Sequence, residues 1–265
     1  MLEVEHLTKV YADGTVALRD VSFSVNEGQF LIIIGLSGSG KSTLLRCINR
    51  LIEPTDGTIR WNGTDITSAS QADLRLIRRK IGMVFQNFNL IRRSSVMSNV
   101  LAGRLGYVNP LASSLHQFSS TDRDRARATL ERFGILDQAH KRADELSGGQ
   151  QQRVGIARAV MQDPQLILAD EPVASLDPVL AHTILGYLER INEEEHITVL
   201  CSLHYLDLVQ RYATQVIGLK RGEIVYRGDH DDIVAMTDAQ FKDIYGEEAE
   251  RVNVGKRRRS SEEAL

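Results

Sequence analysis

Alternating apolar and polar positions near the N-terminus predict two half-buried strands. Leu2 and Val4 alternate with acidic residues, and Phe23 and Val25 repeat the same two-residue period. A period of two places every second side chain on one face of a sheet. Residues 57–63 form a third strand-like stretch bounded by glycines, so we expect an antiparallel layer in this part of the chain.

Continuous apolar runs further along the chain predict a second kind of strand. They occupy residues 30–34, 81–85, 166–169, 198–201 and 215–219. Strands without polar alternation are buried on both faces, which is typical of a parallel sheet between helices. The two kinds of strand together predict an α/β fold with a parallel sheet and an antiparallel β flank.

Helical periodicity separates these runs and predicts an inserted helical subdomain at about residues 87–160. Residues 122–133 are charged and amphipathic, and apolar residues recur at helical spacing between positions 179 and 194. Apolar positions three or four residues apart lie on one face of a helix.

The composition is that of an ordinary globular protein and excludes few functional classes. Of the 265 residues, 42% are hydrophobic and 25% charged, and the net charge of −3 gives no global field that would attract nucleic acid. Cys47 and Cys201 are far apart and lack metal-ligand spacing, so we expect two buried apolar side chains. The acidic N-terminus is unlike a signal peptide, and no apolar run approaches the ~20 residues that span a bilayer. Any membrane role is therefore expected to come through a partner.

The last residues, 247–265, differ from the rest and are expected to be a disordered charged tail. An acidic stretch precedes a basic tetrad at residues 256–259. Two interpretations of the tetrad remain open: contact with anionic lipid or nucleic acid, or a solvated tail. Composition favours the second.

One glycine-rich stretch carries the clearest chemical signal. Residues 35–42, Gly-Leu-Ser-Gly-Ser-Gly-Lys-Ser, fit G-x-x-x-x-G-K-[ST], and they lie between a strand-like run and a helical stretch. Glycines let the backbone turn successive N–H groups inward, and the helix N-terminus attracts anions. The motif predicts a nucleotide site in which Lys41 reaches the β- and γ-phosphates and Ser42 ligates Mg²⁺. The alternative is a glycine-rich turn with a surface lysine.

Two adjacent acids supply the expected metal partner. Asp170 and Glu171 directly follow the apolar run at 166–169, at the strand end where open α/β sheets bind ligands. Asp170 is expected to hold Mg²⁺ with Ser42, and Glu171 to orient an attacking water. The alternative is an acidic pair in a solvated turn.

A second helix start has the features of an anion site. Ser147, Gly148 and Gly149 precede Gln150 and a helical stretch, so free N–H groups are expected there as well. Because one loop already surrounds the phosphates from one side, the second suggests closure from the other side, by a second subunit.

Together these motifs resemble the ATP-binding subunits of ABC transporters. Residues 146–150, Leu-Ser-Gly-Gly-Gln, resemble that family's signature, and the phosphate loop and the acid pair match its other motifs. The resemblance covers about residues 1–246. It implies a P-loop NTPase core of the ABC ATPase type, ATP and Mg²⁺ as cofactors, and a head-to-tail homodimer that encloses two ATP molecules.

The resemblance also implies roles for individual residues. Tyr11, ahead of the first hairpin, resembles the aromatic that stacks on adenine, with a strand-end aromatic as the alternative. Gln86 resembles the glutamine that senses Mg²⁺ and γ-phosphate, and His204 the histidine that contacts γ-phosphate; the alternatives are a surface amide and a loop histidine. Residues 175–177, Ser-Leu-Asp, resemble the loop that crosses the dimer interface, and Asp177 also fits a helix cap before Pro178.

The predicted site falls into three groups. The expected catalytic residues are Glu171, His204, Lys41 and Gln86. The expected metal ligands are Ser42, Gln86 and Asp170. The expected nucleotide-binding residues are Tyr11, Gly35, Ser37, Gly38, Ser39, Gly40, Lys41, Ser42, Thr43, Ser147, Gly149, Gln150 and Asp177.

Longer stretches are similar to phosphonate importers within the family. They lie at residues 85–91, 99–106, 169–178, 203–208 and 217–222. This similarity implies ATP hydrolysis that drives phosphonate import at the cytoplasmic face of the plasma membrane. The implied partners are two transmembrane permease subunits and a periplasmic or extracellular substrate-binding protein, without nucleic acid. Importers of phosphite, phosphate or another small solute are alternatives, as are a soluble ABC-type ATPase, a regulatory nucleotide-binding protein and an exporter.

Overall fold

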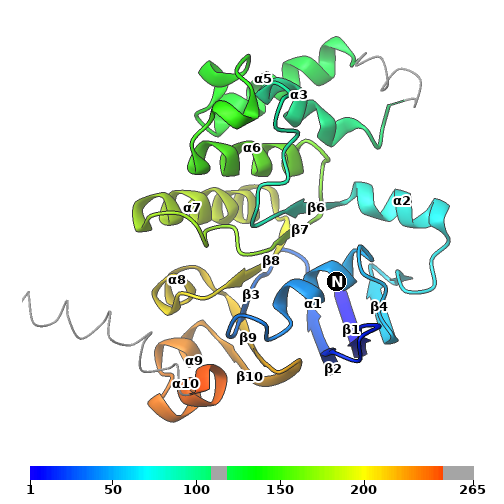
Figure 1. The fold of residues 1–265 in the computed structure, drawn as a ribbon, viewed down its shortest axis with the longest axis vertical. Helices are drawn as coiled ribbons and strands as arrows, with labels where there is room; N and C mark the ends of the chain where they lie inside the picture. The colour runs from blue at the N-terminus through cyan, green and yellow to red at the C-terminus, as the bar shows by residue number, and fades with distance from the viewer. Residues whose placement is uncertain (109–117, 247–265) are drawn as a thin grey trace, which may run out of the picture.

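Two sheets with helices around them make up the described part of the chain (Figure 1). The computed structural model describes residues 1–108 and 118–246. The tail expected at 247–265 lies outside the described residues.

The smaller sheet is antiparallel, as the alternating N-terminal pattern predicts. Its strand order is β2-β1-β4-β5, and β1 pairs Leu2 with both Val25 and Trp61. The four strands are β1 (Leu2–Val10), β2 (Val16–Val25), β4 (Asp56–Trp61) and β5 (Thr64–Asp65).

The larger sheet has the order β10-β9-β3-β8-β7-β6 and confirms the parallel sheet expected from the apolar runs. Its first five strands in chain order pair in parallel, whereas β10 pairs antiparallel with β9 at the edge. Every second residue of β10 is exposed, so it lacks the apolar run by which the other strands are found. The strands are β3 (Phe30–Ile34), β6 (Ile81–Val84), β7 (Leu166–Ala169), β8 (Thr198–Leu203), β9 (Gln215–Lys220) and β10 (Glu223–Asp229).

The helices lie between and outside the strands. They are α1 (Lys41–Ile48), α2 (Gln71–Arg79), α3 (Val96–Leu101), η1 (Ala102–Arg104), α5 (Ser120–Arg132), η2 (Leu136–Gln138), η3 (Ala143–Glu145), α6 (Gly148–Val160), α7 (Pro178–Glu195), α8 (Leu206–Tyr212), α9 (His230–Val234) and α10 (Asp238–Tyr245).

The helical stretch begins later than the sequence pattern suggests. Helix α3 starts at Val96, whereas the pattern places the change at about residue 87. Phe88 and Asn89 have φ angles of 57° and 49°, in the left-handed region that an α-helix cannot contain. Residues 85–95 are therefore a structured loop.

The larger sheet separates two apolar clusters. Phe30, Ile32 and Ile34 of β3 face one cluster, and Leu31 and Ile33 face the other. Helices α6 and α7 belong to the first cluster and α1 to the second. Strand β3 is thus buried on both faces, which explains its continuous apolar sequence.

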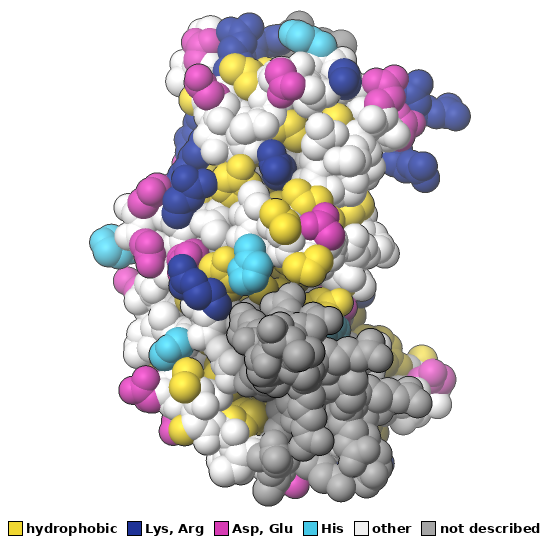
Figure 2. Space-filling view, turned by 90° about the vertical axis from the view of Figure 1, so that its left-hand side faces the viewer, with side chains coloured by type: hydrophobic (Ala, Val, Ile, Leu, Met, Phe, Trp, Pro, Cys, Tyr) yellow, Lys and Arg dark blue, Asp and Glu magenta, His cyan; other side chains and the backbone are white. Residues whose placement is uncertain are grey.

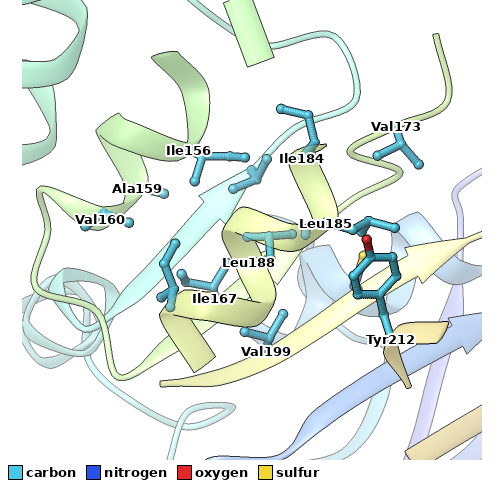
Figure 3. Close-up of a cluster of buried hydrophobic side chains, with 14 of the residues drawn as sticks. Ile156, Ala159, Val160, Ile167, Val173, Ile184, Leu185, Leu188, Val199 and Tyr212 are labelled. Carbon is cyan, nitrogen blue, oxygen red and sulfur yellow. The ribbon is translucent and has the colours of Figure 1, made fainter. Parts of the chain in front are cut away.

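Helix α7 lies between α6 and the sheet. Figure 3 shows Ile184, Leu185 and Leu188 of α7 among side chains of α6, such as Ile156, and of the neighbouring strands, such as Val199. The residues of this cluster that Figure 3 labels are at most 8% exposed, so α6 is joined to the sheet through a dry layer.

The outer surface carries charges of both signs. Figure 2 shows acidic and basic side chains interspersed with small apolar areas over the described part of one face. The described part of that face therefore has no patch of a single charge sign.

Candidate functional site

The predicted residues meet at the carboxyl edge of the parallel sheet. Gly35 follows β3, Gln86 follows β6, the pair at 170–171 follows β7, and His204 follows β8. Because these four strands are adjacent and parallel, their ends carry the four loops to one place.

Glycine is required at both ends of the phosphate loop. Gly35 and Gly40 have φ angles of 146° and 109°. A Cβ on Gly35 would lie 2.2 Å from the carbonyl oxygen of Leu219, and one on Gly40 would lie 2.5 Å from that of Ala17. The loop can therefore curl only where side chains are absent.

Helix α1 begins directly after the loop with its first N–H groups free of a side-chain cap. Its N-cap is Gly40, which offers no side-chain acceptor. Ser39 is almost fully buried, and its Oγ has no hydrogen-bond partner. Free helix N–H groups and an unused hydroxyl form a site suited to an anion.

Lys41 lies inside the curl of the loop. Its Nζ donates to the carbonyl oxygens of Gly35 at 2.8 Å and Leu36 at 2.9 Å. The side chain is 2% exposed, and Nζ is 3.6 Å from Oε1 of Glu171. Burial lowers the pKa of the Lys41 ammonium, although Glu171 and then Asp170 oppose the shift.

Asp170 is fully buried and accepts hydrogen bonds on both carboxylate oxygens. Ser42 Oγ donates to Oδ1 at 2.7 Å, and Ser202 Oγ lies 3.4 Å from the same atom. Arg46 donates to Oδ2 at 3.0 Å. Three donors, one of which is the Arg46 cation, offset the cost of burying this charge.

Arg46 and Ser202 are site residues that the sequence motifs do not predict. Arg46 lies four residues after Ser42 on α1, and this spacing places both side chains on one helix face. That spacing is a signal that could have identified Arg46. Ser202 follows Cys201 in a buried strand, and nothing in its local pattern marks a polar contact with Asp170.

Glu171 is held by its backbone conformation and by contacts with His204 and Lys41. Its φ angle is 46°, and its N–H donates to Ser202 Oγ at 2.9 Å. The carboxylate accepts from His204 Nε2 and faces Lys41. The hydrogen bond from His204, with a smaller contribution from Lys41, lowers the pKa of the Glu171 carboxyl although burial raises it.

His204 also reaches the phosphate loop through its other nitrogen. Nδ1 lies 3.0 Å from the carbonyl oxygen of Gly35 and 3.4 Å from Lys41 Nζ. An imidazolium donates to Gly35 and Glu171 together, whereas the neutral Nε2–H tautomer accepts from Lys41 at Nδ1. Either form connects β8 to the loop after β3.

Tyr11 lies near the start of α1, in the connection between β1 and β2 and thus inside the first hairpin. Its hydroxyl is 3.2 Å from Thr43 Oγ1, and the residue is 37% exposed. A partly exposed ring beside the loop leaves an aromatic surface open to a ligand. Ser37 and Gly38, at the tip of the loop, are exposed.

Gln86 is placed beside the acid pair by strand pairing. The N–H of Asp170 donates to the carbonyl of Val84 at 2.9 Å, and Gln86 follows two residues later. Its side chain is neither fully buried nor fully exposed.

The second helix start is capped by its own residues. Ser147 Oγ accepts from the N–H of Gln150 at 3.4 Å, and the Gln150 side chain accepts from the N–H of Ser147 at 3.0 Å. Gly149 is buried beside Leu180 of α7. Asp177 caps α7 through a 3.0 Å hydrogen bond from the N–H of Leu180, as the cap interpretation predicts.

The two helix starts belong to opposite faces of the sheet. Helix α6 packs in one apolar cluster and α1 in the other, with the strands between them (Figure 1). Within one chain, Ser147 and the phosphate loop are therefore separate features.

The donor set around Ser42 and Asp170 fits Mg²⁺. A hydroxyl and a carboxylate oxygen 2.7 Å apart are hard oxygen ligands, and Mg²⁺ takes few protein ligands when phosphates and water complete its shell. Within the described parts of the chain, no group of three or more His, Cys, Asp or Glu side chains is arranged to hold a metal ion.

Comparisons with known proteins agree with this geometry. A family model described as ABC transporter matches residues 18–174. A phosphonates import ATP-binding protein, PhnC, from Bdellovibrio bacteriovorus is 52% identical over 253 residues, which cover 95% of this chain and 96% of that protein. The protein named PhnC 3 from Halalkalibacterium halodurans is 48% identical over 93% of this chain and 94% of its own length.

Solved structures show the same fold. A dimeric ATP-binding cassette, MJ0796, in a post-hydrolysis state bound to ADP and Pi superposes with a TM-score of 0.78. It is 35% identical and covers 87% of this chain and 99% of that chain. The ADP conformation of the cassette MJ1267 has a TM-score of 0.79 at 30% identity and covers 96% of this chain and 98% of its own.

Proposed function

This chain belongs to the ABC transporter family, and we propose that it hydrolyses ATP to drive the import of phosphonates through a partner membrane permease. The observation that carries the proposal is the convergence of four side chains from three distant parts of the chain. Lys41 begins α1, Asp170 and Glu171 follow β7, and His204 follows β8. About half of the residues are also shared with phosphonate import proteins over nearly the whole chain. We propose that residues 1–246 act as one ATP-binding domain.

The phosphate loop binds the phosphates of ATP in this proposal. N–H groups of residues 35–43 and the ammonium of Lys41 surround the β- and γ-phosphates. Tyr11 supplies a ring for adenine. Ser42, Gln86 and Asp170 hold Mg²⁺, which neutralises phosphate charge when it is bound.

Glu171 acts on the attacking water. Its lowered pKa keeps the side chain ionised at neutral pH, so the carboxylate can orient and polarise a water molecule. His204 and Lys41 face the same volume as Glu171 and stabilise the γ-phosphate. Catalysis then rests on positioning and on charge stabilisation.

A second copy of the chain completes the site. Ser147, Gly149, Gln150 and Asp177 of one subunit approach the ATP that the other subunit holds. The location of α1 and α6 on opposite sides of the sheet supports this arrangement, because one chain alone leaves the two helix starts apart.

The partners in this proposal are two transmembrane permease subunits, which the chain meets at the cytoplasmic face of the plasma membrane, and a periplasmic or extracellular substrate-binding protein. Within the described residues, every helix is too short or too polar to span a bilayer. The chain in this proposal attaches to the membrane through the permease.

Purification of the tagged chain from mildly solubilised membranes tests the proposal. We expect a multi-span permease and a binding protein that binds aminoalkyl phosphonates in preference to phosphite and phosphate. A binding protein selective for phosphite or phosphate would overturn the substrate class. Recovery with ribosomes or nucleic acid, and without a permease, would overturn the transport function.

A further inference from the structure

The loop between β6 and α3 is fastened to helix α6 by one side chain. Arg158 of α6 donates from Nη1 to the carbonyl oxygen of Asn89 at 2.6 Å and from Nη2 to that of Phe88 at 3.1 Å. The planar fork of a guanidinium holds two neighbouring acceptors on two separate nitrogens in a fixed geometry, whereas an ammonium presents all its donors from one rotatable nitrogen. Arg158 therefore holds two consecutive backbone carbonyls at once.

The two held residues are in an unfavourable backbone conformation. Phe88 and Asn89 both have positive φ angles, a region that non-glycine residues rarely adopt and that is least favourable for a bulky side chain such as that of Phe88. This conformation persists only where surrounding contacts stabilise it. The two hydrogen bonds from Arg158 are such contacts.

Phe88 also touches the first turn of the same helix. A Cβ on Gly148 would lie 3.6 Å from Cζ of Phe88, and a Cβ on Gly155 would lie 3.7 Å from its carbonyl oxygen. A Cβ at either position would be in ordinary van der Waals contact with Phe88, so the loop lies close to this face of α6. The ring of Phe88 reaches Gly148, which directly follows Ser147.

Gln86 lies between the part of the chain that is held by the sheet and the part that is held by the helices. Val84 is tied to the sheet by the N–H of Asp170, two residues before Gln86. Phe88, two residues after Gln86, is tied to α6. The position of Gln86 therefore depends on where α6 lies relative to β6 and β7.

We propose that Arg158 is a positioning residue that makes Gln86 follow the helix that begins at Ser147. The inference rests on the proposed function, in which Gln86 contacts the nucleotide of its own subunit and Ser147 that of the partner. Through Arg158, engagement of Ser147 at one nucleotide changes the position of Gln86 at the other. The two sites of the dimer are thereby connected.

Substitution of Arg158 by lysine keeps the positive charge and removes the two-carbonyl fork. We expect the amides of residues 85–91 to exchange with deuterium about tenfold faster in Arg158→Lys, and those of residues 30–42 to be unchanged. Arg153→Lys is the matched control, because Arg153 lies on the same helix with its guanidinium over the Tyr187 ring. That control is expected to leave exchange in 85–91 unchanged.

Kinetics provide a second readout. We expect Arg158→Lys to lower kcat for MgATP by about tenfold and to leave the Kd for ATP within about twofold, because the fork positions Gln86 without holding ATP. Equal losses in kcat and ATP affinity, or unchanged exchange in 85–91, would overturn the proposal. If Arg158→Lys does not fold, Arg158→Gln, which also removes the guanidinium that bonds both carbonyls, is judged by the same two readouts.

Hydrogen exchange and kinetics test this inference and the proposed function separately. If the unsubstituted protein hydrolyses no ATP, the proposed function fails. The exchange of residues 85–91 still decides whether Arg158 holds the loop.

Discussion

His204 donates a hydrogen bond from Nε2 to Oε1 of Glu171, although 33 residues separate them in the chain. Parallel pairing of β7 with β8 brings the two residues together, since one follows the end of each strand. Lys41 lies against the same carboxylate oxygen. One acid therefore joins the phosphate loop and two strand ends.

Replacement of Glu171 by glutamine is expected to stop turnover without preventing nucleotide binding. The amide keeps the size and a hydrogen-bond acceptor for His204, but it loses the charge that polarises water. We expect kcat to fall by about 10²- to 10⁴-fold, with the Kd for ATP within a few-fold of that of the unsubstituted protein. Steady-state hydrolysis and equilibrium nucleotide binding measure the two quantities, and normal turnover would remove Glu171 from the mechanism.

The same variant tests the shared site. With hydrolysis blocked, ATP is expected to hold two subunits together, because γ-phosphate contacts favour the closed pair. Light scattering should then report a dimer when ATP is added to Glu171→Gln and a monomer when ADP is added. A monomer under both conditions would contradict the two-subunit arrangement.

Glu171 also predicts a pH dependence of stability. Its pKa in the folded protein is lower than the ordinary value of 4.5, so the ionised form stabilises the fold. This contribution is fully present above the unfolded-state pKa and is lost as the pH falls through the lower folded-state pKa. The difference in Tm between the unsubstituted protein and Glu171→Gln should shrink from about pH 6 to about pH 3, and a constant difference would count against the ion pair.

Substitution of two glycines of the phosphate loop by alanine is expected to lower the free energy of unfolding by different amounts. A Cβ on Gly40 would lie 2.5 Å from a backbone oxygen, whereas a Cβ on Gly38 meets no atom within 4 Å. Both have positive φ angles, so Gly38→Ala is expected to cost about 1 kcal/mol and Gly40→Ala about 3 kcal/mol or more. Denaturant unfolding measures both, and equal losses would mean that the loop relaxes away from Ala17.

Lys41→Ala is expected to weaken ATP binding by at least about tenfold, since it removes a charge-assisted hydrogen bond from a dry site. Because Nζ also joins the carbonyls of Gly35 and Leu36, the variant should lose some stability as well. Isothermal titration with ATP measures the affinity, and an unchanged Kd would exclude Lys41 from the phosphate site.

Asp170→Asn is expected to abolish the part of ATP stabilisation that depends on Mg²⁺. The amide carries no negative charge for the metal and leaves Arg46 without its ionic partner. Thermal unfolding with ATP, in magnesium and in a chelator, separates the two contributions. If magnesium raises the Tm of Asp170→Asn as much as it raises that of the unsubstituted protein, Asp170 is not a metal ligand.

Many elements could be predicted from the sequence because apolar runs and helix caps depend on neighbouring residues. The apolar runs at 166–169 and 198–201 predict β7 and the start of β8, and the residues before Pro178 predict the cap at Asp177. Burial of Cys47 and Cys201 was likewise predicted. Strand β10 and the loop at 85–95 were not predicted. Burial alternates along β10, and the loop depends on positive φ angles at Phe88 and Asn89, whose carbonyls bond to a side chain of α6.

The phosphate loop, the acid pair, the helix start at Ser147 and the family to which they belong could all be identified from the amino-acid sequence alone. These features depend on a few residues close together in the chain, where glycine, charge and helix ends impose fixed chemistry. The folded arrangement was needed to show that His204 bonds Glu171, that Arg46 and Ser202 share Asp170, and that Arg158 holds the loop after Gln86. Such contacts join residues far apart in sequence, so they form only once strand order and helix packing bring them together.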